Sequence, residues 1–169
     1  MAARRGSAQE QHRKAVAAYV AAGGEESVQR VITALYGVTK KLDHWYTRQC
    51  ADLGLTQGEW AVLAALAKAH DSQVTPSRLA ELTSCAPSSM THRLDKMAGR
   101  GLVRRTPDKT NRTRILVSLT AAGWELFSSA IREADVVESD TLRRLSDAER
   151  LELGRLLEIV IAGLDDIES

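Results

Sequence analysis

Side chains that can bind phosphates and the edges of bases are concentrated in the middle of the chain, between residues 75 and 120. The hydroxyls of Ser and Thr and the nitrogens of His, Lys and Arg all donate hydrogen bonds to such groups. The segment holds nine Lys and Arg residues against three Asp and Glu residues, a balance of +6. This balance suits a polyanion as partner, although a block of charge is usually a plain solvated surface.

The charges outside this segment conceal it in the total. Residues 1–74 carry a balance of +2 and residues 121–169 one of −7, so the chain of 169 residues has a net charge of only +1. The acidic C-terminal part can lie elsewhere in space. The near-neutral total therefore does not argue against a polyanion.

The candidate contact residues fall at the starts of two short helices and at the tip of a hairpin. A helix has the right diameter to enter the major groove of DNA, and Arg93 is the candidate reader of a base edge. Arg112 at the hairpin tip can reach a narrowed minor groove. The predicted DNA contacts are Thr75, Ser77, Arg78, Ser88, Ser89, Thr91, His92, Arg93, Lys109, Arg112 and Arg114. Alternatively, the Ser and Thr side chains only cap a helix, and Arg114 is a strand residue facing solvent.

Start and stop signals predict the two short helices. Thr75 followed by Pro76 offers a hydroxyl cap and a proline in the first turn, which predicts a helix over 76–83. Pro87 suits the first turn of a second helix that ends near Gly99. Two short helices joined by so short a turn form a helix-turn-helix.

The hydrophobic period changes after this helix-turn-helix. Gly101 can take the left-handed conformation that ends a helix. Residues 102–106 and 113–119 then flank a polar tip at 107–111. This pattern predicts a two-stranded hairpin, or wing, after the second short helix.

Five further helices are predicted around these elements. In a capping box, a Ser or Thr hydroxyl accepts from the amide three residues on, and a Glu reaches back to the cap amide. Apolar periodicity, boxes and single caps predict helices over 9–22, after Ser27, over 57–70 from Thr56 and Glu59, after Thr120, and from Ser146 and Glu149 to the end of the chain. The predicted fold class is mainly α with a small β-hairpin.

Long apolar stripes on the outer helices need burial. The helix after Thr120 is expected to bury Trp124, Phe127 and Ile131. Two other stripes consist of Val28, Ile32, Leu35, Val38, Leu42 and Trp45, and of Leu153, Leu156, Leu157, Val160, Ile161, Leu164 and Ile167. They predict one helical layer built by two subunits, a homodimer; packing within a single chain is the alternative.

The ordered series of elements resembles the MarR (multiple antibiotic resistance regulator) family of winged helix-turn-helix transcription factors over about residues 28–168. The residues that carry the resemblance are Leu55-Thr56-x-x-Glu59-Trp60-x-Val62-Leu63, Thr75-Pro76-Ser77-x-Leu79-Ala80, Leu94-Asp95-Lys96-Met97, Arg100-Gly101-Leu102-Val103-x-Arg105 and Leu119-Thr120-x-x-Gly123. The wing departs from the family's usual Asp-x-x-Asp-Arg-Arg tip. Asn111 replaces an acidic residue that would brace the wing arginine, and Thr113 replaces an arginine.

The resemblance implies a cytoplasmic, homodimeric, sequence-specific regulator, most often a repressor, that binds double-stranded DNA at a pseudopalindromic operator. The domain plan is then an N-terminal extension over 1–26, a helical dimerisation region over 27–55 and 121–169, and a winged helix-turn-helix domain over 56–120. The family also implies a pocket for a small aromatic or anionic effector between the helical layer and the winged domain. Its candidate lining residues are Tyr36, His44, Trp45 and Trp60, each of which can equally be plain core or interface.

Other classes of protein find little support in the sequence. No stretch approaches the roughly 18 apolar residues of a membrane span. Cys50 and Cys85 are too far apart in the sequence to argue for a disulfide framework, and the four His residues lack metal-ligand spacing, so no metal and no cofactor are expected. There is no Gly-rich phosphate loop and no Gly-x-Ser-x-Gly, so an enzyme is not expected.

Two alternatives to an effector-controlled regulator remain open at this point. One is a DNA-binding architectural or silencing protein that responds to no effector. The other is a redox-sensing regulator, because Cys85 precedes the second short helix, where a helix start and nearby Arg can depress a thiol pKa. A buried, inert thiol is the plain interpretation of the same residue.

Overall fold

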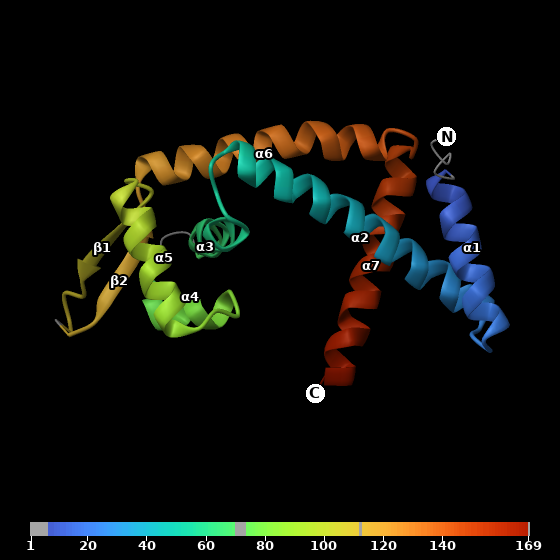
Figure 1. Cartoon of the computed structure of the whole chain (residues 1–169), viewed down its shortest axis with the longest axis horizontal. Helices are drawn as coiled ribbons and strands as arrows, with labels where there is room; N and C mark the ends of the chain where they lie inside the picture. The colour runs from blue at the N-terminus through green and yellow to red at the C-terminus, as the bar shows by residue number, and fades with distance from the viewer. Residues whose placement is uncertain (1–6, 70–73, 112, 169) are drawn as a thin grey trace, which may run out of the picture. The chain divides into compact units, whose positions relative to one another are not determined.

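The structure is a computed structural model that describes residues 7–69, 74–111 and 113–168. It is mainly helical, with one antiparallel hairpin (Figure 1), and the predicted fold class is confirmed. The elements are α1 (Ala8–Ala21), α2 (Glu26–Asp52), α3 (Gln57–Lys68), α4 (Pro76–Leu82), α5 (Pro87–Gly99), β1 (Val103–Pro107), β2 (Ile115–Leu119), α6 (Ala121–Leu142) and α7 (Asp147–Glu168).

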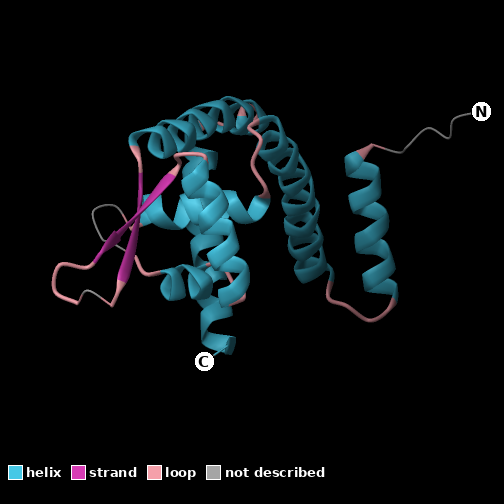
Figure 2. Ribbon diagram, turned by 60° about the vertical axis from the view of Figure 1, so that its left-hand side comes forward, coloured by secondary structure: helices cyan, strands magenta, loops and turns pink. Residues whose placement is uncertain are grey.

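The chain divides into two compact units, Met1–Ala61 and Val62–Ser169. The first unit contains a helical hairpin of α1 and α2, drawn in Figure 2. The Ser7 hydroxyl accepts from the amide of Glu10 at 3.2 Å and so caps α1. Helix α2 starts at Glu26, slightly earlier than the predicted start after Ser27. Glu25 takes the cap position, and the Ser27 hydroxyl donates a hydrogen bond to the Glu25 carboxylate.

The second unit holds the core that supports the helix-turn-helix and the wing. The apolar faces of α4 and α5, the end of α3 and the hairpin contribute to it. Its buried side chains are Val62, Leu63, Leu66, Val74, Leu79, Ala80, Met90, Leu94, Met97, Leu102, Val103, Leu116 and Val117. Burial of apolar surface stabilises a fold by about 25 cal/mol per Å². The burial of these side chains therefore holds the short helices in place.

Three of the predicted helix starts are confirmed by their cap hydrogen bonds. The Thr75 hydroxyl accepts from the amide of Arg78 at 3.2 Å. Both predicted capping boxes form: the amides of Thr56 and Ser146 each donate to the Glu three residues on, at 2.8 Å. Such caps satisfy amides that the helix itself leaves without acceptors.

The wing pairs β1 with β2 in a register that joins Val103 to Leu119 and Pro107 to Ile115. One contact goes beyond the predicted hairpin. Val74 forms an isolated bridge with Val117, whose amide donates to the Val74 carbonyl at 2.8 Å. The segment before α4 is thereby tied to the second strand of the wing.

The first turn of α6 closes tightly on the chain that leaves α5. Gly101 has φ = 71°, the left-handed conformation that the sequence predicted. The Thr120 hydroxyl donates to its carbonyl at 2.6 Å and accepts from the amide of Gly123 at 3.0 Å. A Cβ on Gly123 would lie 2.0 Å from the Leu102 carbonyl oxygen, so only glycine fits there.

The expected core residues of α6 are partly wrong. Trp124 and Ile131 are each 46% exposed, and the helix instead buries Ala130 and Ala134 together with Gly123. The buried face of α6 is therefore made of small residues, and at Gly123 it lies against the Leu102 carbonyl. Phe127, the third expected core residue, is half-buried.

Candidate nucleic-acid interface

Helices α4 and α5 meet at a sharp turn, as a helix-turn-helix requires. Ser84 adopts φ = 47°, a left-handed conformation that non-glycine residues rarely take. The Cys85 amide donates to the Ala80 carbonyl at 2.8 Å, which closes the end of α4. The chain then enters α5 at Pro87, as predicted.

Helix α5 has one completely buried face and one open face. Met90, Leu94 and Met97 are inaccessible to solvent, which fixes the rotation of the helix about its axis. As a result, Ser88, Ser89, Thr91 and His92 are exposed. These four predicted contact residues therefore lie on the open face of one helix.

Arg93 is only partly exposed, although the sequence pattern predicted it among the exposed residues of this helix. It lies three residues after Met90 and four before Met97, at the edge of the buried stripe. Its aliphatic part can follow that stripe while the guanidinium reaches solvent. A base contact by Arg93 stays a prediction.

The start of α5 offers backbone donors as well. Its cap residue is Ala86, which makes no side-chain cap hydrogen bond. Amides in the first turn of a helix have no intrahelical acceptor, and they bind phosphate oxygens readily. The Thr91 hydroxyl, in contrast, donates to the Pro87 carbonyl at 3.1 Å, so only its lone pairs remain for a partner.

The predicted contacts on α4 are already engaged in part. The Thr75 hydroxyl is the helix cap. The Arg78 guanidinium forms an exposed ion pair with Glu81 at 2.9 Å, while Ser77 is exposed. An exposed pair of this kind is weak, so Arg78 can exchange Glu81 for a phosphate at small cost.

The wing tip is shaped by two side chains that accept from the turn. Asp108 accepts from the amide and the hydroxyl of Thr110, both at 2.8 Å. Asn111 accepts in the same way from the amide and hydroxyl of Thr113, at 3.2 and 2.7 Å. These bonds within the turn order the tip without a packed core.

Asp108 also braces one of the predicted contact residues. Its second oxygen lies 3.9 Å from the Arg114 guanidinium. The hydrogen bonds from Thr110 lower the pKa of Asp108, and the charge of Arg114 contributes to the lowering. Arg114 precedes β2 and is exposed, as is Lys109. Arg112 lies outside the described residues.

Two further arginines lie at the base of the wing. The Arg104 Nε donates to the Ser118 hydroxyl at 3.0 Å, across the hairpin. The Arg105 guanidinium reaches back to α5, where it contacts Asp95 and the Thr91 carbonyl. This role of Arg105 was not predicted from the sequence, because a contact between residues ten or more positions apart has no local signal.

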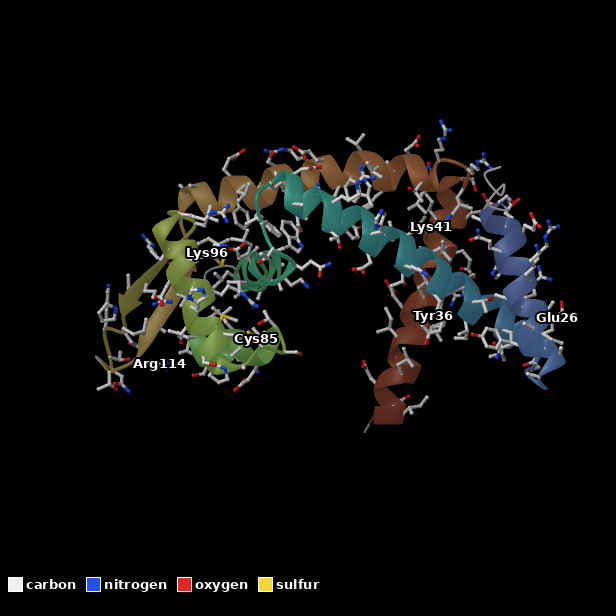
Figure 3. All side chains as sticks on the ribbon, in the orientation of Figure 1. Glu26, Tyr36, Lys41, Cys85, Lys96 and Arg114 are labelled. Atoms are coloured by element: carbon white, nitrogen blue, oxygen red, sulfur yellow. The ribbon has the colours of Figure 1, made fainter. Side chains whose placement is uncertain are left out.

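The candidate effector residues lie on α2 and at the start of α3. Tyr36 is 74% exposed (Figure 3), His44 is exposed, and Trp45 and Trp60 are half-buried. Two cavities in the same unit, of about 600 and 240 Å³, follow the seam of α1 and α2 and are lined by other residues. The predicted effector pocket therefore stays a prediction.

The two cysteines, metal sites and membrane spans were considered in the sequence as alternatives to a DNA-binding site. Cys85 is half-buried, with its sulfur 3.5 Å from the Ala86 carbonyl; Cys50 is buried, which raises the pKa of its thiol. Within the described residues, no three or more His, Cys, Asp and Glu side chains are grouped to hold a metal ion. In the same residues, every helix is too short or too polar to span a bilayer.

Comparisons with known proteins match the same part of the chain. The model of the MarR family matches residues 53–112. The transcriptional regulator HosA of Escherichia coli O157:H7 is 38% identical over 97 residues, which cover 57% of this chain and 70% of HosA. The transcriptional repressor YetL of Bacillus subtilis is 29% identical over 90 residues; the match spans 53% of this chain and only about half, 54%, of YetL.

The fold is also similar to solved structures. One is a mutant of S. aureus MepR bound to an oligodeoxyribonucleotide, with a TM-score of 0.61 and 17% sequence identity. The match covers 78% of this chain and 95% of MepR. The helix-turn-helix, the wing and the sequence matches agree with the resemblance drawn from the sequence. The chain belongs to the MarR family of DNA-binding transcriptional regulators.

Proposed function

We propose that this protein regulates transcription by binding a pseudopalindromic operator as a homodimer, with α5 in the major groove and the wing beside it. The observation that carries the proposal is the two-sided α5. Its buried stripe holds the helix firmly, and its open face presents hydroxyls, an imidazole and uncapped first-turn amides. This is the arrangement that a recognition helix needs to bind phosphates and base edges.

The wing supplies the second set of contacts. Lys109 and Arg114 are exposed next to turns in which Asp108 bonds Thr110 and Asn111 bonds Thr113. Such local bonds reduce the conformational entropy that these turns lose when they bind. The phosphate backbone next to the groove that α5 enters is contacted by Lys109 and Arg114. Arg112 is a further contact that is predicted from the sequence alone. In MepR, the similar fold is bound to an oligodeoxyribonucleotide.

The dimer rests on helix α7. Within residues 147–167, none of its apolar side chains is buried, and Ile161 and Leu164 are 59% and 56% exposed. A continuous apolar stripe on one helix is unfavourable in water and marks an interaction surface. A second copy of the chain covers it, and two-fold symmetry then presents two recognition helices to half-sites roughly 34 Å apart.

Control by a small molecule completes the proposal. The protein is a cytoplasmic repressor that acts by binding and not by catalysis, and an aromatic or anionic effector at Tyr36, His44, Trp45 and Trp60 releases it from DNA. Such a ligand shifts the equilibrium only if it prefers the DNA-incompetent state. YetL, whose name describes a repressor, supports this direction of control.

The test is fluorescence anisotropy with a duplex from the intergenic region beside the protein's own gene, compared with a scrambled duplex over a series of salt concentrations. A preference of about a thousandfold for the native duplex is expected of a specific regulator. If six side chains per dimer neutralise phosphates, log K falls with log salt with a slope of about −5. Equal binding to both duplexes would point to an architectural or silencing protein instead.

Arg93→Ala tests the assignment of the recognition helix. Loss of a bidentate base contact is expected to weaken binding to the native duplex at least about tenfold and to reduce the preference over the scrambled duplex. Arg144→Ala, at an exposed site between α6 and α7, is the matched control and should change the affinity little. Equal affinities of the Arg93 variant and the parent protein would remove Arg93 from the interface.

A further inference from the structure

One side chain in the second unit joins the wing directly to the backbone of α5. The Arg105 Nη1 lies 2.6 Å from Oδ1 of Asp95. Its Nη2 donates to the main-chain carbonyl of Thr91 at 3.1 Å. The planar guanidinium thus binds a carboxylate and a carbonyl that lie one helical turn apart on α5. Lysine, with a single ammonium group, cannot reproduce this fork.

The backbone of β1 places Arg105 for this contact. Val103 and Arg105 are two residues apart in the strand and so share one face of the hairpin. Val103 on that face is buried, and the Arg105 side chain is only 29% exposed, against 56% for Arg114 at the tip. The Arg105 Nε is buried, without a hydrogen-bond partner among the described residues. Its inner nitrogen is therefore shielded from solvent.

The Thr91 carbonyl lies next to the residues expected to contact DNA. Thr91 is followed by His92 and Arg93, and a contact to its carbonyl fixes the helix itself and not only a side chain. The wing is a two-stranded hairpin with one added bridge at Val74, and hairpins of two strands are marginally stable alone. The angle between wing and α5 therefore depends on contacts such as this one.

We propose that Arg105 is a positioning residue, which locks the wing to α5 and sets DNA affinity without touching DNA. The proposal rests on the proposed function for its effect on DNA binding, whereas the lock itself is a property of the free protein. The competing role is a direct contact, in which Arg105 leaves Asp95 and binds a phosphate. The two roles predict opposite effects for the loss of Asp95.

Asp95→Ala separates the two roles. The substitution removes a negative charge from the basic segment, which by electrostatics alone strengthens DNA binding. If Arg105 positions the wing, the loss of its partner is expected to weaken binding at least about tenfold, against the electrostatic trend. If Arg105 binds phosphate directly, freeing it leaves the affinity unchanged or improves it, and that result overturns the proposal.

Arg105→Lys and Arg104→Lys are a matched pair that keeps the net charge. Arg104 is the neighbouring arginine, and among the described residues its side chain is seen to bond Ser118 on the other strand of the wing. Arg105→Lys is expected to weaken binding at least about tenfold, and Arg104→Lys by no more than about threefold. In the double variant with Asp95→Ala, Arg105→Lys adds little, because both changes remove the same interaction. Additive effects would contradict the lock.

Hydrogen exchange in the free protein tests the lock without DNA. Peptides that cover 103–119 are expected to exchange faster in Arg105→Lys and Asp95→Ala than in Arg104→Lys, while the core of α5 around Leu94 stays protected. If no duplex binds the parent protein, the proposed function fails, and the exchange data still decide whether the lock exists. Unchanged exchange in the wing of both variants would overturn the inference.

Discussion

Helices α5 and α7 carry apolar residues at the same spacing but use them differently. In α5, Met90, Leu94 and Met97 are completely buried within the single chain. In α7, Ile161 and Leu164 keep more than half of their surface exposed. A repeat of three to four residues therefore predicts that a face will be covered, but it does not say what covers it.

The difference separates two tasks within one unit. The buried stripe of α5 fixes which face points outward, so the positions of its polar side chains are defined before any partner binds. The apolar stripe of α7 is exposed, so the described part of the chain does not show which surface covers it. Substitutions in the two helices should therefore affect different equilibria: unfolding for α5 and association for α7.

The largest effect is expected for Leu94→Ala. Leu94 is fully buried, and truncation leaves a cavity in a core that cannot collapse freely. The free energy of unfolding should fall by about 3 to 5 kcal/mol, measured by urea denaturation at a fixed protein concentration. Leu156→Ala in α7 is the counterpart: it should destabilise the isolated subunit much less, because Leu156 is 46% exposed. Equal losses in both would erase the distinction between the helices.

Gly123 in α6 and Gly163 in α7 should respond to substitution by Ala in opposite directions. Gly123→Ala places a Cβ 2.0 Å from a backbone carbonyl oxygen, and the resulting strain should cost about 2 to 3 kcal/mol of unfolding free energy. Gly163 lies in α7, and beyond its chain neighbours and the nearby backbone of its own helix no atom of the described residues lies within 4 Å of the position that a Cβ would take there. Gly163→Ala should stabilise the helix by about 0.5 to 1 kcal/mol. Thermal unfolding of both variants, with the direction of each shift in Tm, checks the pair.

The sequence predicted most of the fold because its boundaries depend on local chemistry. Thr56 with Glu59 and Ser146 with Glu149 form the boxes that their spacing indicated. Such bonds join residues three positions apart, so the pattern contains both partners. The wing followed from the change of period after Gly101.

The parts that the sequence did not predict depend on contacts between distant residues. Val74 bridges Val117, and Arg105 reaches Asp95, across intervals that no periodic pattern covers. Trp124 was expected in the core of α6, but its helix packs through Ala130 and Ala134. DNA binding by the contact residues of α4, α5 and the wing stays a prediction. These contacts form only with DNA, and their geometry is not determined by the protein chain alone.

The exposed stripe of α7 should control the association of two subunits. Leu164→Asp puts a charge on the exposed stripe of α7 and should weaken the proposed dimer at least about 30-fold, equivalent to about 2 kcal/mol, because the carboxylate would be buried without a partner. Sedimentation equilibrium measures the constant, and Leu164→Met, which keeps the volume and the apolar character, is the control. Leu164→Asp should retain the helical circular dichroism of the parent protein. A dimer that Leu164→Asp leaves intact would show that α7 associates through another face or not at all.

The smallest effect is expected at the two carboxylates whose pKa is lowered by neighbouring hydroxyl and amide donors. Thr110 lowers the pKa of Asp108 in the wing, and Ser146 lowers that of Glu149 at the start of α7. Their folded-state pKa values are depressed, so the order that they provide is fully present above the ordinary values of 3.8 and 4.5 and is lost as the pH falls through the lower folded values. Carbonyl-carbon NMR titration should show both shifts. Thr110→Ala removes one donor and should move the Asp108 titration toward higher pH while leaving Glu149 unchanged. If Asp108 does not move, the hydroxyl of Thr110 does not control its pKa, and the lowering comes from the backbone amides of the turn and the charge of Arg114, which the variant keeps.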